Sequence, residues 1–156
     1  MNITRRKFLQ LTCSAFLASQ TLPGFVYGMN VKVPVLVYHE VTHLLKGDYV
    51  IPPDDFASQM EWLYFNGYKT VFVKDLYSVF SENYAKIAVI TFDDGSLTFI
   101  DYAFPVLKEY GFKVTINLVG SWINSKKQVL SWDECRYLKS SGFVDFGCHS
   151  YNFHNS

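Results

Sequence analysis

The stretch AVITFDDG, residues 88–95, places two adjacent carboxylates directly after a run of apolar residues. Residues 86–92, KIAVITF, are rich in β-branched and apolar side chains and predict a buried strand. Asp93 and Asp94 follow that strand at once. Adjacent like charges beside an apolar core cost free energy unless a bound cation or a catalytic role compensates them. The stretch therefore predicts both a buried strand and a candidate site at its carboxyl end.

Strands and helices alternate along the rest of the chain. Further strands are predicted at residues 33–40, 69–73, 113–119 and 144–150. Helical segments are predicted at residues 52–68, 75–83, 97–112 and 131–143. Apolar strands that alternate with helices are typical of parallel strands covered by helices, which is the α/β class.

Three local patterns concern the ends of these helices. Asp54 follows two prolines and is a candidate N-cap for the first helix. Pro105 falls inside a helical pattern and predicts a kink or a restart there. Ser131 and Glu134 have the spacing of a capping box, which predicts a helix that begins after Ser131.

The bulk composition indicates one globular domain. The chain has 156 residues, of which 49% are hydrophobic and 18% are charged. The formal net charge is zero, which argues against a nucleic-acid partner because such a partner requires a positive surface. Aromatic residues make up 18%, and we expect most of them in the core rather than on a sugar-binding platform.

Residues 1–28 are interpreted as a signal peptide, which leaves residues 29–156 as the folded domain. Arg5 and Arg6 precede a short apolar run and resemble a twin-arginine export signal. An uncleaved N-terminal anchor is the alternative, but the apolar run is too short and too polar for a comfortable membrane span. We therefore expect export to the periplasm or cell surface, with no membrane span in the mature chain.

Two cysteines remain beyond the leader, Cys135 and Cys148. A disulfide is possible outside the cytoplasm. Two buried free thiols are the favoured interpretation, because Cys135 lies in a helical pattern and Cys148 ends an apolar strand.

Several polar residues fall at the carboxyl ends of predicted strands. Functional groups of α/β folds collect at these ends, which parallel packing brings to one edge of the sheet. Asp93 and Asp94 end one strand and His149 ends another, so we expect them to lie together. His39 ends the first strand and fits either the lining of a cleft or a purely structural histidine, whereas His43 has no supporting context.

The segment HSYNFH, residues 149–154, adds a second histidine, His154. A five-residue spacing separates the two imidazoles on a helix, so a shared role needs the bend that a strand end and turn supply. Two imidazoles and one carboxylate suit a catalytic divalent metal such as zinc. Asp94 would then coordinate, while Asp93 would accept a proton from water. Each pattern alone has a plainer interpretation, because DDG is commonly a turn and neighbouring histidines are often solvated.

The segments TFDDG, 91–95, and HSYNFH, 149–154, resemble the first two motifs of the polysaccharide deacetylases with a NodB-like homology domain. The segments VPVLVYHEV, FASQMEWLYFNGYKTV and SGFVDFGCHS are also similar to that family. The resemblance covers residues 33–154. The histidine spacing and the YHEV segment are most similar to the branch that acts on poly-β-1,6-N-acetylglucosamine.

This resemblance implies a distorted (β/α) barrel with fewer than the usual eight strands. It also implies metal-dependent hydrolysis of N-acetyl groups from polysaccharides that contain N-acetylglucosamine. By matched position, Asp94, His149 and His154 would bind the metal, most simply zinc, with nickel or cobalt as alternatives. Asp93 would be the general base.

The family pattern continues with an arginine-containing motif and a late histidine that acts as general acid, and neither has a counterpart in these 156 residues. We therefore expect an incomplete barrel, its N-terminal part only, with little or no deacetylase activity by itself. A truncated, catalytically inactive remnant that binds metal or glycan weakly is the alternative. A sugar-binding module built on aromatics is a third possibility, but no spaced aromatic repeat supports it.

Overall fold

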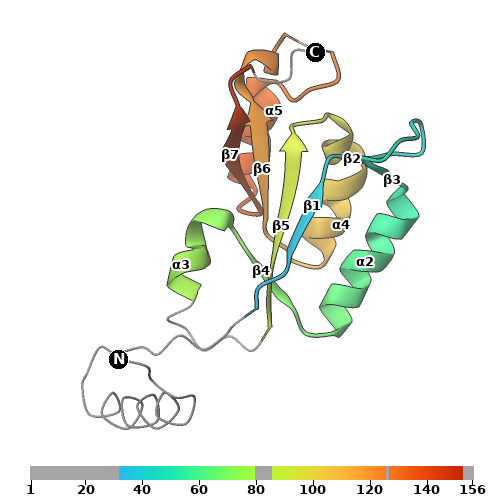
Figure 1. The fold of residues 1–156 in the computed structure, drawn as a ribbon, viewed down its shortest axis with the longest axis vertical. Helices are drawn as coiled ribbons and strands as arrows, with labels where there is room; N and C mark the ends of the chain where they lie inside the picture. Colours follow the sequence, from blue (N-terminus) through green and yellow to red (C-terminus); the bar gives the residue numbers. More distant parts are fainter. Residues whose placement is uncertain (1–31, 80–85, 126, 153–156) are drawn as a thin grey trace, which may run out of the picture. The chain divides into compact units, whose positions relative to one another are not determined.

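The computed structural model describes residues 32–79, 86–125 and 127–152. Its elements fall in one compact unit, Val33–Ser156 (Figure 1). The strands are β1 (Val35–Tyr38), β2 (Glu40–Val41), β3 (Val50–Ile51), β4 (Lys69–Val71), β5 (Ile87–Asp94), β6 (Val114–Val119) and β7 (Val144–Ser150). The helical elements are α2 (Pro53–Phe65), η1 (Val73–Asp75), α3 (Leu76–Val79), η2 (Phe99–Ala103), α4 (Phe104–Glu109), η3 (Gly120–Trp122) and α5 (Trp132–Ser140).

Five of these strands form one parallel sheet in the order β1–β5–β6–β7, with β4 paired to the first residues of β5. Strands β2 and β3 form a separate two-stranded parallel pair. All the pairings in the large sheet are parallel, so the predicted α/β class is confirmed. The sheet of the described residues is open, with β1 and β7 at the two ends of its order, as expected for part of a barrel.

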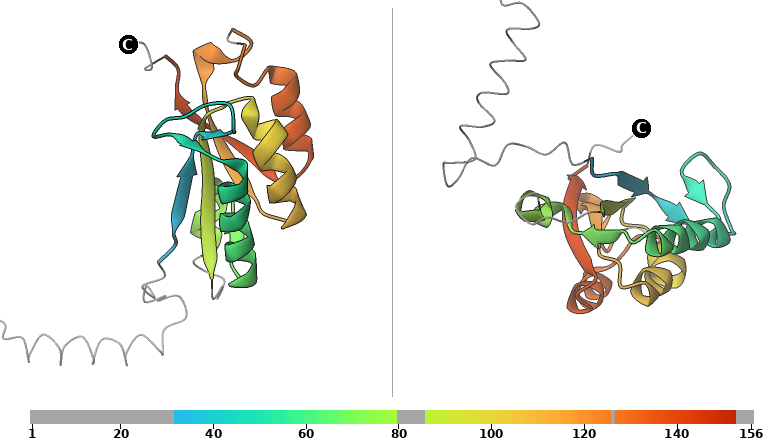
Figure 2. Two further views of the ribbon diagram at one scale, coloured as in Figure 1. Left: turned by 90° about the vertical axis from the view of Figure 1, so that its right-hand side faces the viewer. Right: turned by 90° about the horizontal axis from the view of Figure 1, so that it is seen from below.

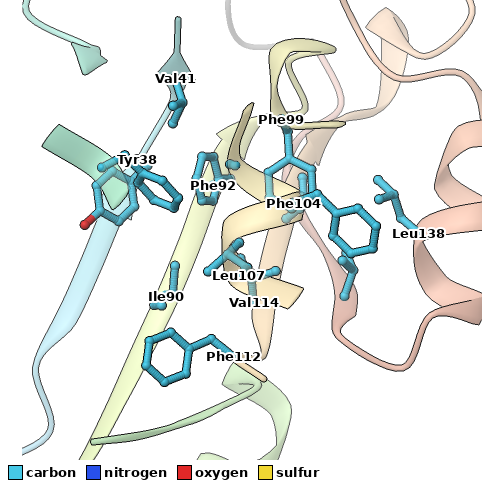
Figure 3. Packing of buried hydrophobic residues seen from close by; sticks show 14 of the residues in the cluster. Tyr38, Val41, Ile90, Phe92, Phe99, Phe104, Leu107, Phe112, Val114 and Leu138 are labelled. Atoms are coloured by element: carbon cyan, nitrogen blue, oxygen red, sulfur yellow. The ribbon is translucent and has the colours of Figure 1, made fainter. Parts of the chain in front are cut away.

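Helices α2, α4 and α5 cover one face of this sheet (Figure 2). The core lies between these helices and the sheet, where Ile90 and Phe92 of β5 are almost completely buried. Figure 3 shows Phe92 between Tyr38 and Phe99, and its ring stacks on the first and meets the second edge-on. Burial of each such side chain contributes roughly 1.5–3 kcal/mol, so this layer anchors β5 in the fold.

Helix α2 begins two residues earlier than a cap at Asp54 predicts. Its N-cap is Pro52 and Pro53 is its first residue, so the prediction that Asp54 caps the helix is wrong. Proline suits the first helical position because its φ is already helical and it has no N–H to satisfy. Asp54 instead lies in the first turn, where a carboxylate interacts favourably with the helix dipole.

The other two helix predictions are confirmed. The Ser131 side chain accepts a hydrogen bond from the Glu134 N–H, and Glu134 accepts one in return from the Ser131 N–H. A π-helical turn, η2, precedes α4, and Pro105 is the second residue of α4. Proline cannot donate to the helix ladder, which explains why the helix restarts there.

The two cysteines differ in environment. Both thiols are free; Cys135 is buried as predicted, and burial raises its pKa to about 11. The prediction that Cys148 is buried is wrong, because this residue is exposed. Along β7, Val144 is buried, Phe146 is half-buried and Cys148 is exposed. The protection therefore decreases toward the carboxyl end of this strand.

An ion cluster around the buried Asp145 carboxylate ties β7 to two other elements. Asp145 is only 6% exposed and binds Lys139 of α5 and, at 2.9 Å, Lys74 of η1. Burial would raise the pKa of this carboxyl, but the hydrogen bonds from Lys139 and Lys74 outweigh it and lower the pKa to about 2. The cluster therefore stabilises the fold while Asp145 is ionised.

Within the ranges that the structure describes, no helix has the length and apolar character needed to span a membrane. The predicted signal peptide, with Arg5 and Arg6, lies outside those ranges.

Candidate active site

The paired carboxylates are the last two residues of β5. The strand turns sharply here, since Asp94 has a φ of 69° and Gly95 a φ of 74°. The left-handed region is costly for most residues, but Asp and Asn tolerate it best after glycine. A methyl group at Gly95 would also lie only 2.5 Å from Leu118 Cδ2, so both the backbone conformation and the available space favour glycine at this position.

His149, near the end of β7, faces both carboxylates. Its Nδ1 lies 3.8 Å from Asp93 Oδ2, and its Nε2 lies 3.7 Å from Asp94 Oδ1. The side chains of Asp94 and His149 are each 30% exposed, whereas that of Asp93 is 14% exposed. The structure thus brings together three of the four predicted site residues, although β5 and β7 are separated by β6.

The fourth residue, His154, lies outside the described residues. In the ranges that are described, no group of three or more His, Cys, Asp or Glu side chains has the arrangement of a metal site. Two of the three predicted ligands, Asp94 and His149, can nevertheless be compared with what a metal requires.

The distance of 3.7 Å between Asp94 Oδ1 and His149 Nε2 is longer than a hydrogen bond. Two ligands at about 2.1 Å from one tetrahedral ion would lie about 3.4 Å apart, so the observed separation needs little adjustment. An imidazole nitrogen and a carboxylate oxygen are also donors that zinc accepts in catalytic sites. The pair therefore fits a divalent ion, and a metal role for it stays a prediction.

Asn117 is a site residue that the sequence interpretation missed. It lies on β6, and its Nδ2 donates a hydrogen bond to Asp93 Oδ1 at 2.8 Å. The available sequence signal was a carboxamide inside the mostly apolar stretch VTINLV, 114–119. A polar residue in such a strand usually has a specific partner.

Glu40 is a second residue that the sequence interpretation missed. Its Oε2 accepts hydrogen bonds from Ser96 Oγ at 2.8 Å and Thr98 Oγ1 at 2.6 Å. These bonds connect β2 to the segment that follows the aspartates. Hydrogen bonds to a carboxylate are stronger than neutral ones, so Glu40 restrains the turn that carries Asp94.

A polar pocket of about 370 Å³ opens beside Asp94. It is lined by Glu40, Asp94, Ser96, Trp122, Lys127, Gln128 and Val129. The pocket combines a half-buried indole with hydrogen-bonding groups of both kinds. Such a lining suits a ligand that has an apolar face and a hydroxylated edge.

The other two described histidines lie elsewhere. The ring of His39 packs on Tyr49 at a centroid distance of 4.9 Å, in a separate hollow that also includes Asp48. His43 is exposed and meets the ring of Tyr102 edge-on. The hollow that includes His39 is distinct from the pocket beside Asp94, so the structure does not place His39 in the lining of that pocket.

The family model described as polysaccharide deacetylase matches residues 80–156. The chain belongs to the polysaccharide deacetylase family. The poly-β-1,6-N-acetyl-D-glucosamine N-deacetylase of Staphylococcus epidermidis is 32% identical over 114 residues, which are 69% of this chain and 39% of that protein. The protein of the same name from Escherichia coli K12 is 28% identical over 113 residues, which are 62% of this chain and 17% of that protein.

Solved structures agree with this assignment. IcaB from Ammonifex degensii aligns with a TM-score of 0.69 at 29% identity, over 78% of this chain and 54% of that one. A de-N-acetylase from Aggregatibacter actinomycetemcomitans aligns with a TM-score of 0.71 at 26% identity, over 79% of this chain and 56% of that one. The chain of this polysaccharide deacetylase family member spans at most about two fifths of the length of the curated relatives it matches.

Proposed function

We propose that this protein removes N-acetyl groups from polysaccharides that contain N-acetylglucosamine, and that the chain supplies the metal ligands and the general base. The observation that carries the proposal is the meeting of Asp93, Asp94 and His149 at one edge of the sheet. Family membership supports the reaction class, and the names of the Staphylococcus and Escherichia relatives support the substrate class.

In this proposal Asp94, His149 and His154 hold a divalent ion, zinc in the first instance, with nickel or cobalt as alternatives. A bound ion supplies Lewis-acid activation of the amide and of the attacking water. Asp93 accepts the proton from that water. Its Oδ2, the oxygen that faces His149, is the proton acceptor, because Oδ1 is already bonded to Asn117.

The pocket beside Asp94 takes a sugar unit next to the scissile amide. Trp122 supplies an aromatic face for the apolar side of the sugar ring, and Glu40 accepts hydrogen bonds from its hydroxyls. The hydrogen bonds from Ser96 and Thr98 hold the Glu40 carboxylate in place before the substrate arrives. An acetylated amino-sugar polymer is thus a partner that matches the lining.

The proposed reaction takes place outside the cytoplasm, in the periplasm or at the cell surface. The paired residues Arg5 and Arg6 ahead of an apolar run support export. N-terminal sequencing of the exported protein should begin near Met29. Recovery of the intact Met1 end from the cytoplasm alone would contradict this part of the proposal.

Metal binding and acetate release by the full 156-residue chain test the proposal together. We expect one zinc ion per chain by titration calorimetry, and no binding by Asp94→Asn, in which Asn still tolerates the left-handed backbone. The leaving amine must be protonated, and a general acid contributes on the order of 10² to 10⁴ in rate. No residue among these 156 is assigned to that role. Acetate release from acetylated glucosamine oligomers should therefore be slow, dependent on zinc, and abolished in Asp93→Asn.

The outcomes separate the candidate functions. Zinc binding with no acetate release would favour the catalytically inactive remnant. Binding of the oligomers without any zinc binding would favour a sugar-binding module. If neither zinc nor the oligomers bind, the proposed function is wrong for this chain.

A further inference from the structure

Three residues form a row across neighbouring strands at the candidate site. Asp93 of β5 is the register partner of Asn117 of β6, and Asn117 is the register partner of Gly147 of β7. Register partners in a sheet project to the same side, so their side chains meet across the strands. The hydrogen bond from Asn117 Nδ2 to Asp93 Oδ1, 2.8 Å long, joins the first two members of this row.

Gly147 leaves the space that the Asn117 carboxamide occupies. A methyl group built on Gly147 would overlap Asn117 Oδ1, while the nearest atom of any other residue, Thr115 Cγ2, would be at an ordinary 3.7 Å. The overlap involves the end of a flexible side chain rather than backbone. An alanine at this position would therefore displace the carboxamide and leave the strand in place.

The two oxygens of Asp93 have different neighbours. Oδ1 accepts the bond from Asn117, whereas Oδ2 lies 3.8 Å from His149 Nδ1. The terminal torsion of an aspartate is broad, so the carboxylate orientation is not set by its own rotamer. The Asn117 carboxamide constrains this torsion, because its hydrogen bond holds Oδ1 and leaves Oδ2 facing His149.

We infer that Asn117, seated in the space left by Gly147, is a positioning residue that orients the Asp93 carboxylate toward His149. The functional part of this inference rests on the proposed function, in which Asp93 is the general base. The geometric part does not, because it concerns only the contacts between the two side chains. An amide-to-carboxylate bond in a partly buried site is charge-assisted, which makes it strong enough to hold one orientation.

Activity of the variants tests the functional part. Asn117→Ala should lower kcat for acetate release about tenfold, the effect of losing a bond worth roughly 1.4 kcal/mol, with KM and zinc affinity unchanged. Gly147→Ala should lower kcat to a similar extent although it removes no polar group. Because both changes break the same contact, the double variant should be no slower than Asn117→Ala alone.

The control is Gly47→Ala, since a methyl group there would meet only Val50 at 3.8 Å and should leave kcat unchanged. Thermal unfolding of each variant shows whether it folds. If the two losses of activity multiply to about a hundredfold in the double variant, the residues act independently and the inference is wrong.

A readout that needs no activity separates this inference from the proposed function. In ¹H–¹⁵N spectra of the full chain, the Nδ2 protons of Asn117 should shift on Asp93→Ala, and shift similarly on Gly147→Ala. Gly47→Ala should leave them in place. If Asp93→Ala or Gly147→Ala leaves the Asn117 signals unchanged, the positioning contact does not exist, whatever the enzyme does. If the signals shift as expected but no variant alters kcat, the contact exists without a positioning role and the inference is overturned.

Discussion

Replacement of Asp145 by asparagine should destabilise the folded chain by about 2 kcal/mol at pH 7. The carboxyl is 6% exposed, and its pKa is lowered from 3.8 to about 2. A difference of roughly 1.8 pKa units at 1.36 kcal/mol per unit gives this magnitude. Asparagine has nearly the same shape but cannot be ionised, so the variant removes the charge and keeps the packing.

The destabilisation should depend on pH in a defined direction. The folded pKa is lower than the unfolded one, so this contribution is fully present above about pH 4 to 5 and is lost as the pH falls toward 2. The difference between wild type and Asp145→Asn should fall to about 1 kcal/mol at pH 3 and to a few tenths at pH 2. Urea unfolding of both proteins, followed by circular dichroism at pH 7, 4 and 3, measures it.

A matched control is available in Asp133, which also pairs with a cation, Arg136, but on the surface. The two side chains are 89% and 69% exposed, so Asp133→Asn should change the free energy of unfolding by less than about 0.5 kcal/mol. If Asp145→Asn is no more destabilising than Asp133→Asn, the ion cluster around Asp145 does not stabilise the fold. A large effect that does not change between pH 7 and pH 3 would show that the lost stability has another cause.

Three further predictions concern single side chains. Ser131→Ala should lower the free energy of unfolding by about 1 kcal/mol through loss of the capping box, and an unchanged thermal midpoint would contradict the cap's contribution. A thiol reagent should label exposed Cys148 in the native chain and Cys135 only after unfolding, as peptide mapping can show; rapid labelling of native Cys135 would contradict its burial. Trp122→Ala should raise KM for acetylated glucosamine oligomers about tenfold with kcat nearly unchanged, because the proposed base Asp93 and the proposed metal ligands remain. An unchanged KM would show that Trp122 does not contact the sugar.

The elements that the sequence predicted well are those with strong local patterns. The run KIAVITF lies within β5 except for Lys86, and VDFGCHS corresponds to β7 from first residue to last. In β5 the apolar and β-branched residues Ile87–Phe92 are all buried, so their pattern is continuous and is visible in the local sequence. The capping box at Ser131 is equally local, since its hydrogen bonds join residues three apart.

The failures share a different cause, which is that they depend on neighbours distant in sequence. The row from Asp93 through Asn117 to Gly147 exists only because of the strand register, which no local pattern specifies. The bonds from Ser96 to Glu40 span 56 positions, and nothing near Glu40 in the sequence indicates them. Cys148 follows an apolar strand, yet burial depends on the tertiary cover available at that end of β7, so the pattern alone was misleading.

Diffraction from zinc-soaked crystals of the full chain, with anomalous data at the zinc edge, would show whether Asp94 and His149 are metal ligands. One zinc peak is expected about 2.0 to 2.2 Å from an Asp94 carboxylate oxygen and from an imidazole nitrogen of His149, with His154 as the third protein ligand. Asp93 should remain outside the coordination sphere, bonded to Asn117. A zinc ion bound elsewhere, or one that coordinates Asp93 in place of Asp94, would contradict the assignment of ligand and base.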